Sequence, residues 1–240
     1  MAVEIITVDI YQKQVTELQA RVASFAQGDG PALCKAIENQ SQLIVSWLGY
    51  LHNYHLTNSA DSLLSAVSSS IRETAACLSL GLIRPALFSL RSEIDLLLAW
   101  LFFKDHPIEW RLVNQTGDGF WMKKDILDYL SAHFSGSRQR LALLKQIRKR
   151  KEEEPYRLLS AHIHGQSEAV LPALVDLKDS VGSSMEVNEA ASVCFEVSEY
   201  LSDVLFSVYA LEWDALPADV KSDVVSRFVS DNQKKEFWSY

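Results

Sequence analysis

The sequence predicts an all-α protein built as an irregular helical bundle. Apolar residues recur with a period near 3.6 along most of the chain, and no stretch alternates apolar with polar residues as a strand would. Glycine (9) and proline (6) are scarce among the 240 residues, and no low-complexity linker divides the chain. Because 48% of the residues are hydrophobic, the chain can bury a sizeable core, and we expect one domain over residues 1–240.

The first half of the chain predicts four helices. Two glycines and a proline between Gly28 and Pro31 end the first helix, and Pro85 suits the first turn of the fourth. The fourth contains the longest apolar run, which predicts a helix buried in the core. The expected extents are residues 9–26, residues 32–54, a segment from a cap at Asn58 or Ser59 to Gly81, and residues 85–104.

The second half predicts a connector, a run of shorter helices and a long final core helix. Glycine and proline mark residues 105–119 as the connector, and Gly165 ends a short helix that begins at Pro155. The other expected helices are residues 123–151 with a pause at residues 135–137, residues 186–213, and residues 217–229. Residues 171–184 resemble a loop, and the aromatic tail after residue 230 is expected to be peripheral.

Charge and cysteine content restrict the class of protein. The formal net charge of −8 argues against a surface that is basic throughout, although a local basic groove is compatible with it. The apolar run from Ile94 to Phe103 is about half the length of a membrane span and contains Asp95. The N-terminus lacks the pattern of a secretory signal, and the three cysteines fit free buried thiols. We therefore expect a cytoplasmic protein with no membrane segment.

The segment Tyr156–Gly165 (YRLLSAHIHG) concentrates polar chemistry in one short helix. On a helix that turns about 100° per residue, His164 lies almost directly above Arg157, two turns away, and Ser160 lies between them. His162 points about 140° away from Arg157. A guanidinium binds a phosphate bidentately, and an imidazole transfers protons at neutral pH. The alternative is a hydrogen-bonded polar cluster that caps the helix.

Metal and cofactor chemistry is not expected. His162 and His164 are separated by about 200° around the helix, and no cysteine or acidic residue completes a zinc-site spacing. The sequence contains no glycine-rich phosphate loop.

Two further groups of arginines are candidates for binding an anionic substrate. Arg84 and Arg91 lie on related faces of the fourth helix, either in a structural ion pair of Arg91 with Asp95 or beside the motif helix. Arg148 and Arg150 belong to a stretch with seven Lys or Arg between residues 138 and 151, which a phosphate backbone could follow. In the alternative, residues 152–154, all glutamates, neutralise this stretch through i,i+4 pairs on a solvated helix.

Together, the Arg-x4-His and Arg-x6-His spacings at Arg157 and the segment LFSLRSEIDLLLAWLFF resemble the HEPN superfamily of all-α proteins. The resemblance covers about residues 60–213. It divides the chain into an N-terminal helical extension (residues 1–57), an HEPN-like bundle core (58–213), and a C-terminal helix with its tail (214–240). Many catalytic members carry a polar residue directly after the arginine, where this chain has Leu158.

The resemblance implies a homodimeric, metal-independent endoribonuclease of a prokaryotic defence or toxin–antitoxin type system. Arg157 would bind the scissile phosphate of RNA, and His164 or His162 would transfer protons. Rotation around the helix favours His164, whereas the Arg-x4-His spacing favours His162. The alternative is a non-catalytic helical module of the same ancestry that binds a partner protein or a nucleotide. A third hypothesis, an acidic inhibitor of a basic partner, depends on net charge alone.

Overall fold

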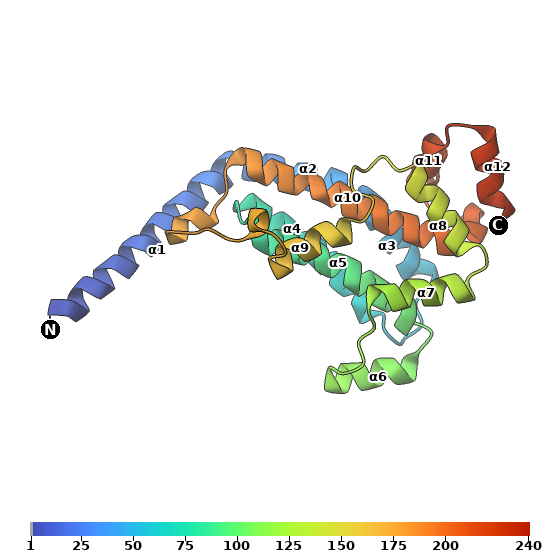
Figure 1. Ribbon diagram of the computed structural model, residues 1–240, viewed down its shortest axis with the longest axis horizontal. Helices are drawn as coiled ribbons and strands as arrows, with labels where there is room; N and C mark the ends of the chain where they lie inside the picture. The colour runs from blue at the N-terminus through green and yellow to red at the C-terminus, as the bar shows by residue number, and fades with distance from the viewer. Residues whose placement is uncertain (1) are drawn as a thin grey trace.

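The computed structural model describes the backbone of residues 2–240 and the side chains of residues 9–240, and within this part the protein is all-α (Figure 1). The described residues form twelve α-helices, with three short 3-10 helices and no strand. The α-helices are α1 (Ala2–Gly28), α2 (Gly30–Gln40), α3 (Gln42–Tyr54), α4 (Ser62–Ser79), α5 (Ile83–Phe103), α6 (Pro107–Thr116), α7 (Lys123–His133), α8 (Ser137–Gln146), α9 (Pro155–His164), α10 (Ser184–Tyr209), α11 (Ala218–Arg227) and α12 (Asp231–Ser239).

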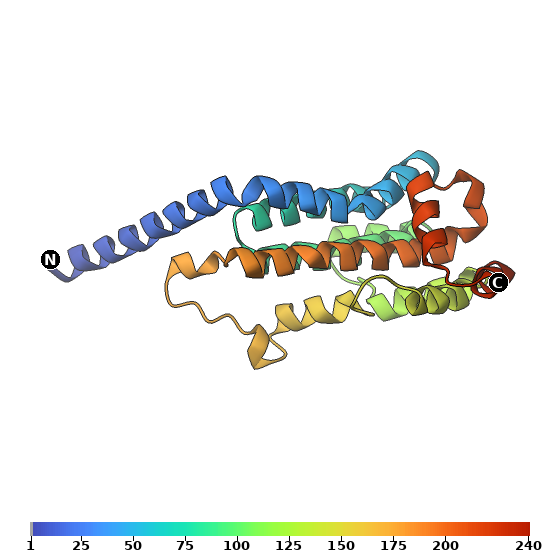
Figure 2. The same ribbon diagram turned by 90° about the horizontal axis from the view of Figure 1, so that it is seen from above.

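The two long helices α5 and α10 form the centre of the bundle (Figures 1 and 2). Every residue from Leu97 to Phe103 in α5 is buried, as is every residue from Glu196 to Tyr209 in α10. A helix that is buried on all sides must be covered by other elements around its whole circumference. The helices α2, α3, α4, α8 and α9 provide this cover for α10, and α4, α7 and α9 pack against α5. The buried helix predicted from the apolar run is therefore confirmed.

Helix α1 projects beyond the rest of the bundle (Figure 2). Only its C-terminal part packs on the body, where Phe25 is buried and Glu17 pairs with Lys178 of the 3-10 helix Leu177–Ser180 at 2.7 Å. Helices α2 and α3, in contrast, belong to the core, because Ile44 and Trp47 are fully buried against α10. The sequence-based boundary at residue 57 thus does not coincide with a gap in the packing.

The helix predicted over residues 32–54 is in fact two helices. Its break lies at Ser41, a buried residue that ends α2 and precedes α3. The polar residues Asn39 to Gln42 surround the break. Among them, Asn39 and Ser41 have modest helix propensity because their side chains compete with the backbone for hydrogen bonds. The apolar pattern continues across the break, so periodicity alone does not reveal it.

The connector predicted over residues 105–119 contains a helix, α6. Pro107 occupies its first turn, and Gly117 ends it in the left-handed conformation with φ of 76°. The same proline and glycine that suggested a loop are thus the start and stop signals of a short helix. The helix stands away from the main bundle (Figure 1).

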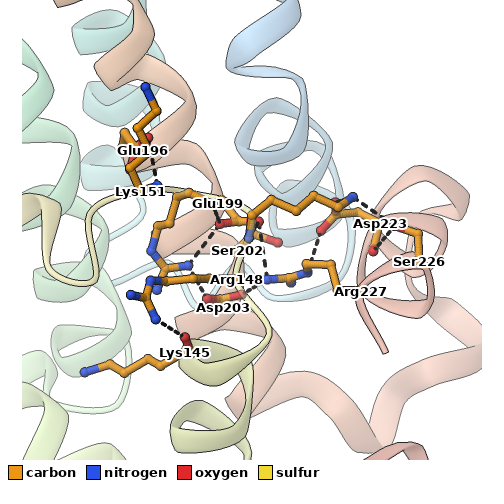
Figure 3. A network of polar contacts seen from close by, with 12 residues as sticks. Lys145, Arg148, Lys151, Glu196, Glu199, Ser202, Asp203, Asp223, Ser226 and Arg227 are labelled. Atoms are coloured by element: carbon orange, nitrogen blue, oxygen red, sulfur yellow. Dashed lines mark hydrogen bonds and ion pairs between the residues drawn. The ribbon is translucent and has the colours of Figure 1, made fainter. Parts of the chain in front are cut away.

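The helix predicted to reach Lys151 ends at Gln146. Instead of continuing the helix, the backbone amides of Lys149 and Arg150 donate to Glu199 of α10 at 3.0 and 2.8 Å (Figure 3). The amides of Lys151 and Glu152 donate to Glu196. Because these residues are not helical, the predicted i,i+4 pairing with residues 152–154 does not form there.

The C-terminal tail is not peripheral. It forms α12, and Phe237 is fully buried beside Phe206 of α10, with ring centroids 5.5 Å apart. Trp238 packs edge-on against Trp213 at 4.9 Å. Burial of Phe237 and the ring contacts of Trp238 stabilise the end of the bundle and explain the aromatic residues near a polar terminus.

None of the described helices is long and apolar enough to cross a membrane. All three cysteines are free, but only Cys194 is buried, whereas Cys77 is half-buried and Cys34 is exposed. The expectation of buried thiols is therefore correct for one of the three.

The core contains a buried carboxyl group that has neither a basic side chain nor a backbone amide as partner among the described residues. Glu93 of α5 is 2% exposed, and it accepts a hydrogen bond from Thr74 of α4 at 3.2 Å. Burial raises the pKa of Glu93 to about 8, so this side chain is protonated in the folded protein at neutral pH.

We predict that Glu93→Gln reduces the loss of folding stability that the wild type undergoes as the pH rises. Between about pH 5 and pH 8 the unfolded chain has lost the Glu93 proton while the folded chain keeps it, so stability falls by roughly 1.4 kcal/mol per pH unit through this group. Urea unfolding from pH 5 to pH 8.5 should show that the free energy of unfolding of the variant rises relative to that of the wild type as the pH increases. The exposed Glu73→Gln serves as the control, and parallel pH profiles for Glu93→Gln and wild type would contradict the assignment.

Candidate functional site

The motif helix α9 has the boundaries that the sequence predicts. Pro155 occupies its first turn, where a missing amide costs no hydrogen bond, and Gly165 ends it in the left-handed conformation with φ of 58°. Leu159 is fully buried and anchors the helix on the bundle. A Cβ atom at Gly165 would lie 2.9 Å from Leu171, so the chain after the helix folds closely over its end. The left-handed conformation favours glycine at this position, and the Leu171 side chain would have to move to admit a Cβ atom.

Arg157 and His164 are both exposed, on one side of α9 and two turns apart. Arg157 lines an open hollow together with Glu152, Glu153 and Ser167. His164 lies outside the residues that line this hollow. Both side chains are available to a ligand or to a second copy of the chain, but carboxylates dominate the surroundings of Arg157.

Ser160 faces α5 rather than the solvent side of Arg157. Its hydroxyl accepts a hydrogen bond from Nε of Arg91 at 3.2 Å. The Arg91 guanidinium lies over the ring of Tyr156, 3.5 Å from its centroid, and also pairs with Asp95. The predicted Arg91–Asp95 ion pair is confirmed, and Arg91 also faces the motif helix. Arg91 is half-buried, and this burial lowers the pKa of its guanidinium.

His162 lies on a different side of α9 from Arg157. It lines a second hollow, which it shares with Arg84 at the start of α5. Burial, and secondly the positive charge of Arg84, lowers the pKa of the His162 imidazole. The structure therefore does not bring Arg157 and His162 together, and the Arg-x4-His spacing joins residues that face different hollows.

Arg150 is a structural residue, which contradicts its predicted role in substrate binding. Its guanidinium is fully buried and pairs with Glu199 and Asp203 of α10, the two carboxylates at the centre of the network labelled in Figure 3. Arg148 is half-buried, and it donates a hydrogen bond to the carbonyl oxygen of Lys145 at 2.6 Å. The predicted basic surface is therefore interrupted after the end of α8, because the side chains of Arg148 and Arg150 are partly or fully buried.

Sequence reasoning missed a polar cluster that fixes the start of α9. Glu154, the residue before the helix, pairs with Lys123 of α7 and with Lys145 of α8, the latter at 2.6 Å. Lys123 also lies 4.6 Å from the ring centroid of Tyr156. Burial lowers the pKa of Lys123 despite its carboxylate partner. No spacing in the sequence joins residues 123, 145 and 154, so only tertiary contact reveals the cluster.

Metal ligands and related proteins give no further assignment. Within the part of the chain that the structure describes, no group of three or more His, Cys, Asp or Glu side chains could hold a metal ion. Comparisons of the chain with protein-family models, curated proteins and solved structures found no match. The geometry of α9 and its neighbours is therefore the basis on which we infer a function.

We predict that Arg150→Ala destabilises the protein by about 3–5 kcal/mol, because it leaves Glu199 and Asp203 buried with less compensation. The exposed Arg138→Ala on α8 should change stability by no more than about 0.5 kcal/mol. Urea unfolding at pH 7 measures both effects. If Arg150→Ala were as stable as the wild type, the structural assignment of Arg150 would be wrong.

Proposed function

We propose that this chain is an HEPN-like endoribonuclease that acts without a metal, as a homodimer in the cytoplasm, in a prokaryotic defence or toxin–antitoxin type system. The observation that carries the proposal is the exposure of Arg157 and His164 on the same side of α9. A cation for a phosphate and a proton-transfer group are the two functions that RNA cleavage through the 2′-hydroxyl requires.

In the proposed reaction Arg157 binds the scissile phosphate. His164 accepts the proton of the ribose 2′-hydroxyl, the 2′-oxygen bonds to phosphorus, and the bond from phosphorus to the 5′-oxygen breaks. His164 of the second copy donates a proton to the leaving 5′-oxygen. The products are a 2′,3′-cyclic phosphate, which water can open to a 3′-phosphate, and a 5′-hydroxyl end.

The distance along α9 favours a site made by two copies. Arg157 and His164 are seven residues apart, which corresponds to roughly 10 Å along the helix axis. The arginine and the histidine of one helix are therefore separated along the helix axis. A second copy packed against the same side of α9 would place a second arginine and a second histidine around one phosphate. His162 has no part in this site because it faces the second hollow.

We predict that the purified protein cleaves single-stranded RNA in the presence of EDTA. Arg157→Ala and His164→Ala should each lower the rate by about 100-fold or more, because a general acid or base contributes on the order of 10² to 10⁴ in rate. His162→Ala is the matched control on the same helix and should retain activity. Cleavage that disappears with EDTA, or that survives in both variants, would contradict the proposal.

A second candidate function is a non-catalytic module that binds a partner protein. The observation that favours it is the lining of the Arg157 hollow, where Glu152 and Glu153 are exposed beside the arginine. Two free carboxylates repel the phosphates of RNA but attract a basic side chain of a partner. Leu158, which follows Arg157, supports the same interpretation.

The double substitution Glu152→Gln/Glu153→Gln separates the two functions. If the protein cleaves RNA, removal of two negative charges beside Arg157 should strengthen RNA binding several-fold at low salt, as a filter-binding titration would measure. If the protein binds a basic partner, the same change should weaken that complex and leave the protein without nuclease activity. If the binding of both RNA and the partner is unchanged, the hollow that contains Arg157 takes no part in either function.

A further inference from the structure

The hollow that contains His162 has the construction of a small-molecule site. It lies between the start of α5, the inner side of α9, the loop after α9 and the start of α10, and its volume is about 490 Å³. This volume lies within the range of pockets that bind ligands, roughly 300–1,000 Å³. Arg157 lines a different hollow, so this site is separate from the surface proposed to bind RNA.

The walls of the His162 hollow are mainly apolar. Leu82 contributes from just before α5 and Leu87 from α5 itself, and the loop after α9 contributes Leu171, Pro172 and Leu174. Leu171 and Leu174 are 53% and 57% exposed, which is unusual for leucines that lie beside a concave surface. An apolar group placed in the hollow would cover them and gain roughly 25 cal/mol for each Å² of apolar surface removed from water.

The acidic residues of the hollow already have backbone partners. Asp179 accepts hydrogen bonds from the amides of Val175 and Asp176 at 3.2 and 2.8 Å. Glu186 accepts from the amide and the hydroxyl of Ser183 at 2.8 and 2.7 Å. These hydrogen bonds lower the pKa of both carboxyl groups, so each stays ionised in its capping role. Neither carboxylate pairs with Arg84.

Arg84 is the cation of the hollow, and it has no carboxylate within ion-pair distance among the residues whose side chains the structure describes. Its guanidinium lies over the ring of Phe88, 5.3 Å from the centroid, which leaves its hydrogen-bond donors free. His162 stands nearby and is neutral at pH 7, because burial and Arg84 both lower its pKa. The hollow thus offers a ligand one cation and one neutral hydrogen-bonding ring, beside two ionised carboxylates that already accept backbone hydrogen bonds.

We propose that the His162 hollow binds a monocarboxylic acid with an apolar body, with the carboxylate on Arg84 and His162 and the apolar part against Leu87, Leu171 and Leu174. The hollow holds one guanidinium and also two ionised carboxylates, so a monoanion is repelled less than a doubly charged phosphate. A planar carboxylate also fits the fork of a guanidinium. Apart from Ser180, the remaining polar side chains of the lining are two carboxylates that already accept backbone hydrogen bonds, which leaves few partners for a sugar or a base and favours this ligand class over nucleotides.

The test uses octanoate as the probe and the full chain at pH 7. Calorimetric titration should detect binding of octanoate, and Arg84→Gln should weaken it at least tenfold, because a charged hydrogen bond to the carboxylate is lost. Arg84→Lys keeps the charge without the planar fork and should bind with an intermediate affinity. The exposed Arg138→Gln on α8 is the matched control and should bind like the wild type.

Two further measurements identify the part of the ligand that is recognised. Octanol carries the same chain without the charge and should bind at least tenfold more weakly than octanoate, and inorganic phosphate should not compete. Leu174→Asn, a change at an exposed position, should weaken octanoate binding without altering the unfolding curve. Absence of octanoate binding, equal binding of octanol, or unchanged affinity in Arg84→Gln would overturn the proposal. Octanoate binding by Arg157→Ala should equal that of the wild type, so the result is independent of ribonuclease activity.

Discussion

The arrangement of the second half of the protein depends on three carboxylates of α10. Glu196, Glu199 and Asp203 follow one another at spacings of three and four residues, so they form one stripe on the buried helix. A buried carboxylate costs several kcal/mol unless it is paired and hydrogen-bonded. The stripe is satisfied only by basic side chains from α11 and from the segment after α8, together with four consecutive backbone amides of that segment (Figure 3). This network fixes the path of the chain from α8 to α9.

The position of the candidate site follows from that path. The network holds the backbone as far as Glu152, and α9 begins only three residues later at Pro155. Glu154 lies between them and is held by lysines of α7 and α8, so the first turn of α9 cannot move far. Arg157 is therefore presented next to exposed glutamates as a result of chain connectivity. The fold itself thus places the glutamates beside this arginine, and any ligand of Arg157 must bind close to their negative charges.

The sequence predicted helix boundaries correctly where residues within the segment itself start and stop the helix. Pro155 and Gly165 mark α9 correctly because a proline start and a left-handed glycine end are properties of the segment alone. The prediction failed between Ile147 and Lys151, where charged residues have good helix propensity but the carboxylates of α10 compete for their amides. The role of Arg150 could not be predicted for the same reason, since its partners lie about fifty residues away in the chain. Both errors arise because carboxylates from a distant helix bind the amides and the guanidinium of this segment, and the periodicity of the sequence carries no information about such contacts.

The two histidines of α9 show how far spacing alone can carry a functional argument. His162 and His164 differ by two positions, and a helix places such residues on nearly opposite sides. The sequence therefore required that only one of them share a face with Arg157, and rotation identified that residue as His164. The sequence could not show that the other side of α9 would face a hollow of its own, because that hollow is made by residues 82–87 and 170–186. One short helix thus separates two chemically different surfaces, an acidic one beside Arg157 and an apolar one beside Arg84.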